Sequence, residues 1–403
     1  MYIARQAVFG SSMKVFGYEL LFRGGMKSAG YDGVSSLQAS ASVLGGLFEN
    51  GINQIVDDKK AFINFDNELL QSDTIELIDP DRLIVEVLEN VSVDENLIQR
   101  VLILKEKGYK IALDDFDENL STYQLIPYAD IIKYDILATP LNQIKEAVKK
   151  MLASKKVLLA EKIETEEEFK KAKSMGFHLF QGFFFSKPCL ITESSSPATV
   201  KSQYTRIIAE IKKEEPSFQA LAEIIEKDAT LAYRLVKLSS TRSGSDMIYT
   251  IKQALTYMGL REIERWIHVL MLRELNDSKP DELMRVSLIR AKFAELTALH
   301  SKVRHLKYEA SIMGLFSTID AMLNQSMADA LKNILLPDTI TDALVKNNGA
   351  LYPIYKLITV YEKGDWAEME EITRALKLNE DIIYSDYLQA VKWAKETMDT
   401  ICS

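Results

Sequence analysis

The chain has 403 residues, enough for two domains, and its 47% hydrophobic content supports ordinary buried cores rather than a disordered chain. A net charge of −9 argues against binding nucleic acid by phosphate neutralisation, so we expect neither DNA nor RNA as a partner. No apolar stretch reaches the length of a membrane span and the N-terminus MYIARQAVFG lacks the core of a signal peptide, so we expect a cytoplasmic protein without a membrane anchor.

Apolar segments of strand length alternate with amphipathic segments throughout residues 1–190. The strand-like segments are 2–9, 14–23, 61–65, 83–89, 110–116, 131–135, 157–164 and 178–188, and the helix-like segments are 35–51, 94–108, 141–155 and 165–176. This alternation favours βαβ units with a parallel sheet, and eight strands are the number that closes a (β/α)8 barrel. Because only GSSM joins the first two strands, the first strand should run antiparallel to the second, which makes the barrel irregular.

The second half of the chain has a different pattern. Residues 191–200, ITESSSPATV, form a linker rich in Ser, Thr and Pro. Beyond it, apolar residues recur at helical spacing, as in 218–240, 250–275 and 380–398. The sequence therefore predicts an α/β barrel over 1–190 followed by an all-helical domain over 201–403.

A polar residue stands at the end of almost every strand-like segment of the first half. These residues are Glu19, Asn64, Glu86, Asp114, Asp115, Lys133, Glu161 and Gln181. Each one alone has an ordinary explanation as a surface charge or a turn former, but the strand ends of one barrel converge on a common mouth. Carboxylate and amide oxygens suit Mg²⁺ or Mn²⁺, and two such ions are a common means of hydrolysing a phosphodiester. The set therefore predicts a metal-dependent phosphodiester site.

Several segments also resemble the motifs of a known family. YELLFR (18–23) resembles the signature of EAL domains, bacterial phosphodiesterases that linearise cyclic di-GMP. The family's other motifs are similar to VEVLE (85–89), DDF (114–116), KYD (133–135), AEKIE (160–164) and QGFFFSKP (181–188). The resemblance covers about residues 1–190, and the family fold is the irregular barrel expected above.

The resemblance implies a role for each matched residue. The metal ligands for two Mg²⁺ or Mn²⁺ ions would be Glu19, Asn64, Glu86, Asp114, Asp115 and Glu161. Glu161 would also be the general base, aided by Lys133 and by Glu89 as the anchor of a catalytic loop. Cyclic di-GMP would contact Leu21, Arg23, Asp135 and Gln181.

Two departures from the family pattern affect the expected activity. Asp117 and Asn119 replace the two glycines of the loop after Asp115, which restricts any positive φ there. Lys162 replaces the glycine after Glu161, where a cation would lower the pKa of Glu161 or compete with the second metal. We therefore expect slow hydrolysis.

The second half is similar to HDOD domains, helical modules related to HD-type metal phosphohydrolases. The similarity lies in 228–240 and 253–272. Ser317 and Thr318 stand where the parent hydrolases carry adjacent His and Asp ligands, so we expect no second metal site, and we expect His268 to be a core or interfacial residue. The domain is predicted to be a regulatory or interaction module for an unidentified protein partner.

The sequence thus predicts a bacterial signalling protein, a cyclic di-GMP phosphodiesterase regulated by its HDOD domain. One alternative is a catalytically weak or inactive receptor or scaffold, and a lower-ranked one is a structural adaptor with an empty barrel. EAL domains commonly pair through the altered loop, so both a monomer and a homodimer stay open. Because every matched residue precedes 191–200, the barrel is expected to bind the nucleotide without any part of 200–403.

Overall fold

The computed structural model describes residues 2–23, 52–88, 91–114, 116, 123–182, 202–243, 250–275, 280–332, 334 and 336–402. The chain divides into two compact units. The first comprises Met1–Cys189, Thr359–Glu371 and Asn379–Tyr384, and the second comprises Leu190–Ile358, Ile372–Leu378 and Ser385–Ser403. The unit that holds the first half of the chain therefore also includes two segments from near its end.

The first unit is built on a closed barrel of eight strands in chain order. The strands are β1 (Tyr2–Gly10), β2 (Val15–Arg23), β3 (Lys60–Phe65), β4 (Leu83–Val87), β5 (Lys110–Leu113), β6 (Ile131–Asp135), β7 (Val157–Glu161) and β8 (Leu179–Phe180). β1 runs antiparallel to both β2 and β8, whereas all other neighbours are parallel. The predicted irregular barrel with one antiparallel strand is confirmed.

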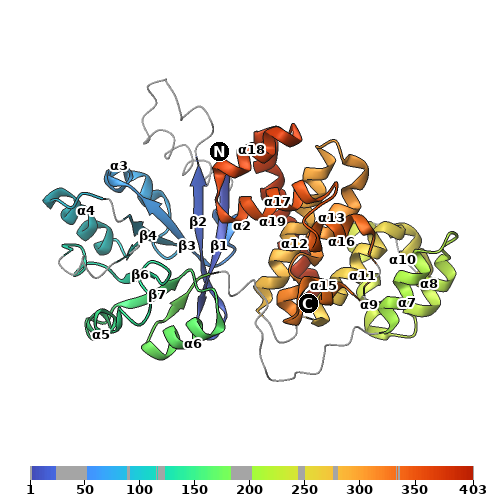
Figure 1. The fold of residues 1–403 in the computed structure, drawn as a ribbon, viewed down its shortest axis with the longest axis horizontal. Coiled ribbons are helices and arrows are strands. Elements are labelled where there is room, and N and C mark those ends of the chain that lie inside the picture. The colour runs from blue at the N-terminus through green and yellow to red at the C-terminus, as the bar shows by residue number, and fades with distance from the viewer. Residues whose placement is uncertain are drawn as a thin grey trace. The chain divides into compact units, whose positions relative to one another are not determined.

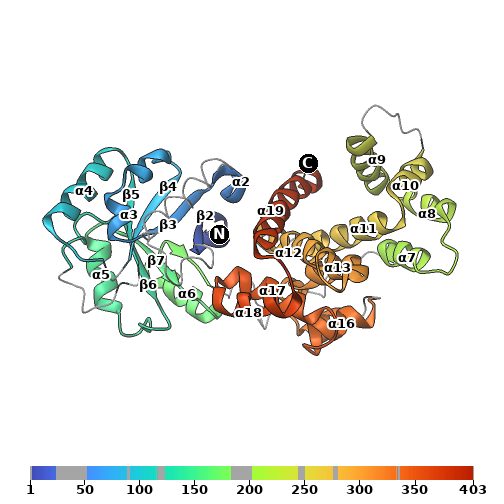
Figure 2. The ribbon, with the colours of Figure 1, turned by 90° about the horizontal axis from the view of Figure 1, so that it is seen from above.

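Short helices connect the parallel strands of the barrel. They are α2 (Ile52–Val56), α3 (Asn67–Gln71), the 3-10 helix η2 (Asp73–Leu77), α4 (Glu95–Glu106), α5 (Lys145–Ala153) and α6 (Glu166–Met175), and α4, α5 and α6 lie outside the ring of strands (Figure 2). A capping box of Thr165 and Glu168 begins α6, and Gly176 at φ 100° ends it. The predicted helices at 94–108, 141–155 and 165–176 are confirmed, while 35–51 lies outside the described residues.

The barrel interior is apolar in its middle. Buried residues from seven different strands form this layer, namely Val8, Phe62, Ile84, Ala112, Ile131, Leu159 and Leu179. Because the middle is filled by side chains, polar residues of the barrel can meet only at its ends. The residues at the carboxyl ends of the parallel strands are the ones that the sequence singled out.

The chain from Ser202 onward contains only helices in the ranges that the structure describes (Figure 1). They are α7 (Ser202–Ile211), α8 (Phe218–Ile225), α9 (Ala229–Ser243), α10 (Ile251–Met258), α11 (Leu260–Leu275), α12 (Asp281–Leu299), η5 (Arg304–Leu306), α13 (Lys307–Phe316), α14 (Ile319–Leu323), α15 (Met327–Leu331), α16 (Asp338–Val345), α17 (Tyr352–Lys363), α18 (Trp366–Leu376) and α19 (Glu380–Cys402). Among the described helices, none has both the length and the apolar composition that crossing a bilayer requires.

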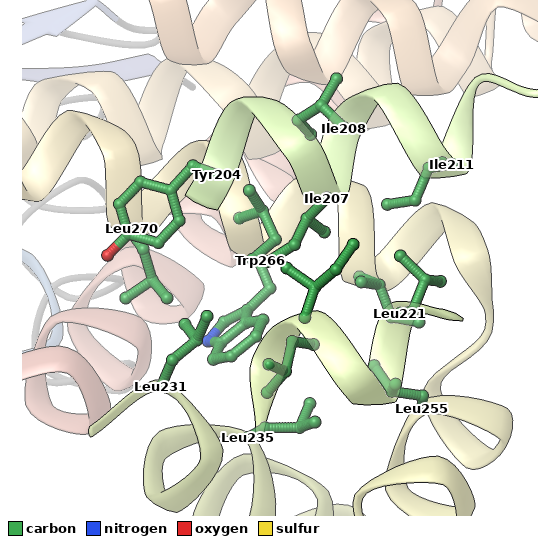
Figure 3. Packing of buried hydrophobic residues seen from close by; sticks show 14 of the residues in the cluster. Tyr204, Ile207, Ile208, Ile211, Leu221, Leu231, Leu235, Leu255, Trp266 and Leu270 are labelled. Carbon is green, nitrogen blue, oxygen red and sulfur yellow. The ribbon is translucent and has the colours of Figure 1, made fainter. Parts of the chain in front are cut away.

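The core of the second unit forms where the apolar faces of several helices meet. Ile207 of α7, Leu221 of α8, Leu235 of α9 and Leu255 of α10 surround Trp266 of α11 (Figure 3). Each of these helices is amphipathic, so its buried face follows from the spacing of its apolar residues. The predicted helical second half is confirmed.

One C-terminal segment of the first unit packs on β1. The ring of Trp366 stacks on that of Tyr2 at 5.6 Å between centroids, and the ring of Tyr361 lies edge-on to both. The Tyr361 hydroxyl donates a 3.0 Å hydrogen bond to the Ile3 carbonyl. Because Tyr2 pairs with Arg23 at the carboxyl end of β2, this contact lies at the mouth end of β1.

Candidate active site

The side chain of Lys133 lies among four carboxylates at the mouth of the barrel. Its Nζ atom is 2.7 Å from both Asp114 Oδ1 and Glu161 Oε1, 2.8 Å from Glu86 Oε1 and 3.5 Å from Glu19 Oε1. The five residues come from β2, β4, β6, β7 and the end of β5, so the strand ends converge here as the sequence suggested. The Lys133 side chain is only 1% exposed, and no carboxylate of the cluster exceeds 15%.

Among the residues that the structure describes, one cation contacts four acids here, and the pKa values reflect this imbalance. Burial raises the pKa of Glu86 well above its ordinary value and that of Glu161 to about 8, despite the attraction of Lys133. Burial would also raise the pKa of Glu19, but Lys133 and the hydrogen bond from Gln181 lower it. Burial alone would lower the pKa of Lys133, but the four carboxylates hold it well above its usual range. The mouth is therefore a site of excess negative charge.

The oxygen atoms at the mouth fit a divalent cation. Within the described residues, Asn64 Oδ1 and Glu86 Oε2 are buried without a hydrogen-bond partner, which is costly for a polar atom. Hard cations such as Mg²⁺ prefer oxygen ligands of this kind. In the described part of the chain, no three acidic, histidine or cysteine side chains already surround one point as metal ligands. Instead, the ammonium of Lys133 stands among the acids.

Glu19 is held in place by two amide side chains. Gln181 Nε2 donates to Glu19 Oε2 at 2.6 Å, and Asn64 Nδ2 donates to Glu19 Oε1 at 3.4 Å. The backbone of Gln181 is bonded to Ala160 and Ile163 on the β7 side. The next residue, Gly182, has φ 151°, and a Cβ atom there would lie 2.3 Å from the Ile163 nitrogen. Glycine is therefore required for Gln181 to reach the mouth.

Gln6 is a polar residue of the site that none of the sequence motifs indicated. It lies on β1 directly opposite Glu19, and its Oε1 accepts a 3.1 Å hydrogen bond from Gln181 Nε2. The available signal was a polar residue within the otherwise apolar segment 2–9. Its assignment required the register of the antiparallel pair, which the sequence alone does not supply.

The surroundings of Asp135 correct one expectation. Asp135 Oδ1 accepts hydrogen bonds from the backbone nitrogens of Leu137 and Ala138, and Oδ2 is 2.5 Å from Lys162 Nζ. Burial opposes ionisation, but the Lys162 contact and the two amides lower the pKa of Asp135. Lys162, at φ 55°, thus pairs with Asp135. The expected lowering of the Glu161 pKa by Lys162 is wrong, because burial raises that pKa to about 8 and Lys162 pairs with Asp135 instead, while competition with a second metal stays a prediction.

Some predicted site residues cannot be placed. Glu89, Asp115 and the loop positions Asp117 and Asn119 lie outside the described residues. Arg23 is placed only by its backbone, which pairs with Tyr2. Leu21 is partly buried and lies on the strand face of Glu19, because the two residues are two positions apart in β2.

In the helical unit, the position of the former HD ligands is occupied by hydroxyl groups. Ser317 and Thr318 are buried, and they bond to Gly314 and Ser287 respectively. His268 is 0% exposed and its ring lies edge-on to Phe316. Within the described residues neither ring nitrogen has a hydrogen-bond partner, and burial lowers the pKa of His268 to about 3. His268 is therefore a core residue, as predicted.

The protein is a closed barrel with one antiparallel strand. At the carboxyl ends of its parallel strands it has an acidic site in which a lysine contacts four carboxylates. The sequence model of the EAL domain matches residues 48–188, and that of the HDOD domain matches residues 198–339. The uncharacterized protein YuxH of Bacillus subtilis is 33% identical over 99% of both chains. The cyclic di-GMP phosphodiesterase CdgJ of Vibrio cholerae is 31% identical over 98% of this chain and 92% of that one. The chain belongs to the family of proteins that join an EAL domain to an HDOD domain.

Among solved structures, the manganese and cy-diGMP complex of BlrP1 from Klebsiella pneumoniae at pH 9.0 is 24% identical to this chain. It covers 46% of this chain and 55% of that one, with a TM-score of 0.37.

Proposed function

We propose that this protein is a metal-dependent phosphodiesterase that linearises cyclic di-GMP. The observation that carries the proposal is the buried Lys133 with four carboxylates at the barrel mouth, together with buried oxygen atoms of Asn64 and Glu86 that fit a cation. The similarity to CdgJ along the whole chain supports cyclic di-GMP as the substrate.

The metal ligands in this proposal are Glu19, Asn64, Glu86, Asp114, Asp115 and Glu161. Two Mg²⁺ or Mn²⁺ ions, when bound, would offset the phosphate charge and acidify the attacking water. Glu161 would accept a proton from that water as the general base. Lys133, 2.7 Å from Glu161, would keep that carboxylate oriented toward the mouth.

The substrate contacts in this proposal come from the rim of the mouth. Leu21 and Arg23 follow Glu19 on one strand face, and Gln181 reaches the mouth beside Glu19. Asp135 would contact the nucleotide only after release from Lys162. Glu89 would anchor the catalytic loop.

One observation favours a second candidate function. Lys162 forms an ion pair with Asp135, a residue with which the enzyme would contact its substrate. A receptor that binds cyclic di-GMP and turns it over slowly or not at all would tolerate this pairing. In either case we propose a bacterial, cytoplasmic signalling protein with a domain boundary at 191–200, regulated through its HDOD domain by a protein partner.

A hydrolysis assay on the purified full-length protein tests the proposal. Cyclic di-GMP is incubated with Mg²⁺ or Mn²⁺, the linear dinucleotide is measured, and Glu161→Gln is the negative control. We expect turnover in the wild type and none in the variant. If saturating Mn²⁺ gives no linear product while calorimetry shows nucleotide binding, the receptor replaces the enzyme.

A further inference from the structure

The segment Thr359–Glu371, which belongs to the compact unit of the barrel, lies beyond the residues that either family sequence model matches. Its aromatic residues Tyr361 and Trp366 cover Tyr2 at the mouth end of β1. Tyr361 is 0% exposed and Tyr2 is 1% exposed, so the contact is buried. The barrel unit therefore has one wall that is contributed from near the end of the chain.

A line of hydrogen bonds runs from this segment to a proposed metal ligand. Gln6 Nε2 donates to the Glu362 carbonyl at 3.4 Å. Gln6 Oε1 accepts from Gln181 Nε2, which also donates to Glu19 Oε2. Glu362 lies in the last turn of α17, where a helix presents its carbonyls to donors outside the helix. The end of α17 thus contacts Glu19 through two glutamine side chains.

A second contact reaches the same strand face. Gly364 ends α17 at φ 70°, with the Gly364 and Asp365 nitrogens bonded to the Tyr361 and Val360 carbonyls. A Cβ atom on Gly364 would lie 2.8 Å from Leu21 Cδ1. Leu21 is two residues from Glu19 on β2, so the glycine packs beside the site.

We propose that Thr359–Glu371 positions Glu19, with Gln6 as the positioning residue that connects them. This inference rests on the proposed function and names the regulation of that same site. The Gln6 amide has one orientation when its nitrogen donates to Glu362 and its oxygen accepts from Gln181. Docking of the segment therefore selects the Gln181 rotamer that also donates to Glu19. Movement of the segment releases Gln6 and lets Glu19 leave its ligand position. The sequence-based prediction that the barrel binds cyclic di-GMP without any part of 200–403 concerns the nucleotide, whereas this inference makes metal binding depend on Thr359–Glu371.

The first experiment measures Mn²⁺ binding to the full-length protein by calorimetry, with Mn²⁺ alone as the probe. Gly364→Ala adds a methyl group against Leu21, and Gln6→Met removes both hydrogen bonds at nearly constant volume. Gly259→Ala is the matched control, because Gly259 has φ 76° and nothing lies within 4 Å of its Cβ position. We expect Mn²⁺ affinity to fall about threefold to tenfold in the first two variants, a range typical of indirect coupling, and to stay unchanged in the control.

The second experiment uses the reciprocity of coupled equilibria. If docking of the segment favours Mn²⁺ binding, Mn²⁺ must favour docking by the same factor. Hydrogen exchange of peptides within 359–371 should therefore slow when Mn²⁺ is added to the wild type. Gly364→Ala should show faster exchange and a smaller response to Mn²⁺.

Two results would overturn the inference. One is an equal Mn²⁺ affinity in Gly364→Ala and Gly259→Ala. The other is a hydrogen-exchange rate in 359–371 that does not change when Mn²⁺ is added. Turnover of cyclic di-GMP by the wild type is measured separately. A wild type that binds Mn²⁺ but hydrolyses nothing contradicts the enzyme, while the coupling is still decided by the Mn²⁺ affinities.

Discussion

Lys133 and Glu86 are buried together at the barrel mouth, with Nζ 2.8 Å from Oε1 and side chains that are 1% and 0% exposed. Two charges at this depth lose their hydration, and their attraction has to compensate for the loss. Glu86 is the next-to-last residue of β4 and has buried neighbours on both sides, so neither residue can move to solvent without disturbing the barrel. The pair therefore determines how the whole acidic cluster responds to substitution.

Lys133→Met should strongly destabilise the metal-free protein. Removing the ammonium leaves the buried acidic cluster without the cation that its oxygen atoms contact, and breaking a buried pair in this way costs about 3–5 kcal/mol. Divalent cations should recover part of the loss. Urea unfolding with and without Mn²⁺ measures both effects, and Lys149→Met is the control because Lys149 forms an exposed pair with Glu146. Equal losses in the two variants would contradict the role given to Lys133.

Glu161→Gln should abolish turnover of cyclic di-GMP and retain most nucleotide affinity. The amide preserves size but cannot accept the proton from water. Glu19→Ala should instead lose Mn²⁺ affinity and activity together. Rates and calorimetric affinities separate the two cases. The exposed Glu164→Gln serves as control and should behave as the wild type.

Through Glu161, the stability of the metal-free barrel unit should fall as pH rises from about 4.5 toward 8. Burial raises the pKa of Glu161 to about 8, so between these values the folded state binds more protons than the unfolded chain. The contribution of Glu161 to the free energy of unfolding is complete below pH 4.5. Above that pH it declines by at most about 1.4 kcal/mol per pH unit. Mn²⁺ competes with these protons, so its stabilising effect should grow with pH. Melting temperatures from pH 5 to 8.5, with Mn²⁺ or with a chelator, provide the test.

Lys162→Gly should speed hydrolysis or strengthen nucleotide binding. The substitution frees Asp135 from its ion pair and places glycine at φ 55°, where a side chain costs about 1–2 kcal/mol. Lys155→Gly is a close control, since Lys155 has φ 58° and follows α5. Relief of backbone strain should raise the free energy of unfolding in both variants. Only Lys162→Gly should change the rate of hydrolysis or the nucleotide affinity. If Lys162→Gly leaves the hydrolysis rate and the nucleotide affinity unchanged, Lys162 does not limit either one.

Acid should destabilise the helical unit through His268. Burial lowers the pKa of His268 to about 3, below the ordinary value of 6.5, so the unfolded chain binds the proton first as pH falls. The free energy of unfolding should decrease by up to about 1.4 kcal/mol for each unit that pH falls between 6.5 and 3. His268→Leu should flatten this slope, and the exposed His305→Leu should leave it unchanged. Circular dichroism along a pH series measures it.

Much of this fold could be predicted because its periodicities are unambiguous. The four-residue connection GSSM predicted the antiparallel β1, since no crossover fits in that length. The convergence of Glu19, Glu86 and Glu161 followed from their strand-end positions. Tertiary contacts could not be predicted in the same way. Gln6 joined the site through its register with Glu19, and Lys162, which has a positive φ after β7, pairs with Asp135.

The contact of Tyr361 with Ile3 also governs when this protein can finish folding. The two residues are 358 positions apart, and Gln6 and Glu362 are 356 apart. Contacts of such long range form late, because the chain between them must be ordered or looped out first. During synthesis, the residues of all eight strands leave the ribosome before Trp366 does. We therefore expect Tyr2 to be covered only after the segment Thr359–Glu371 has been made.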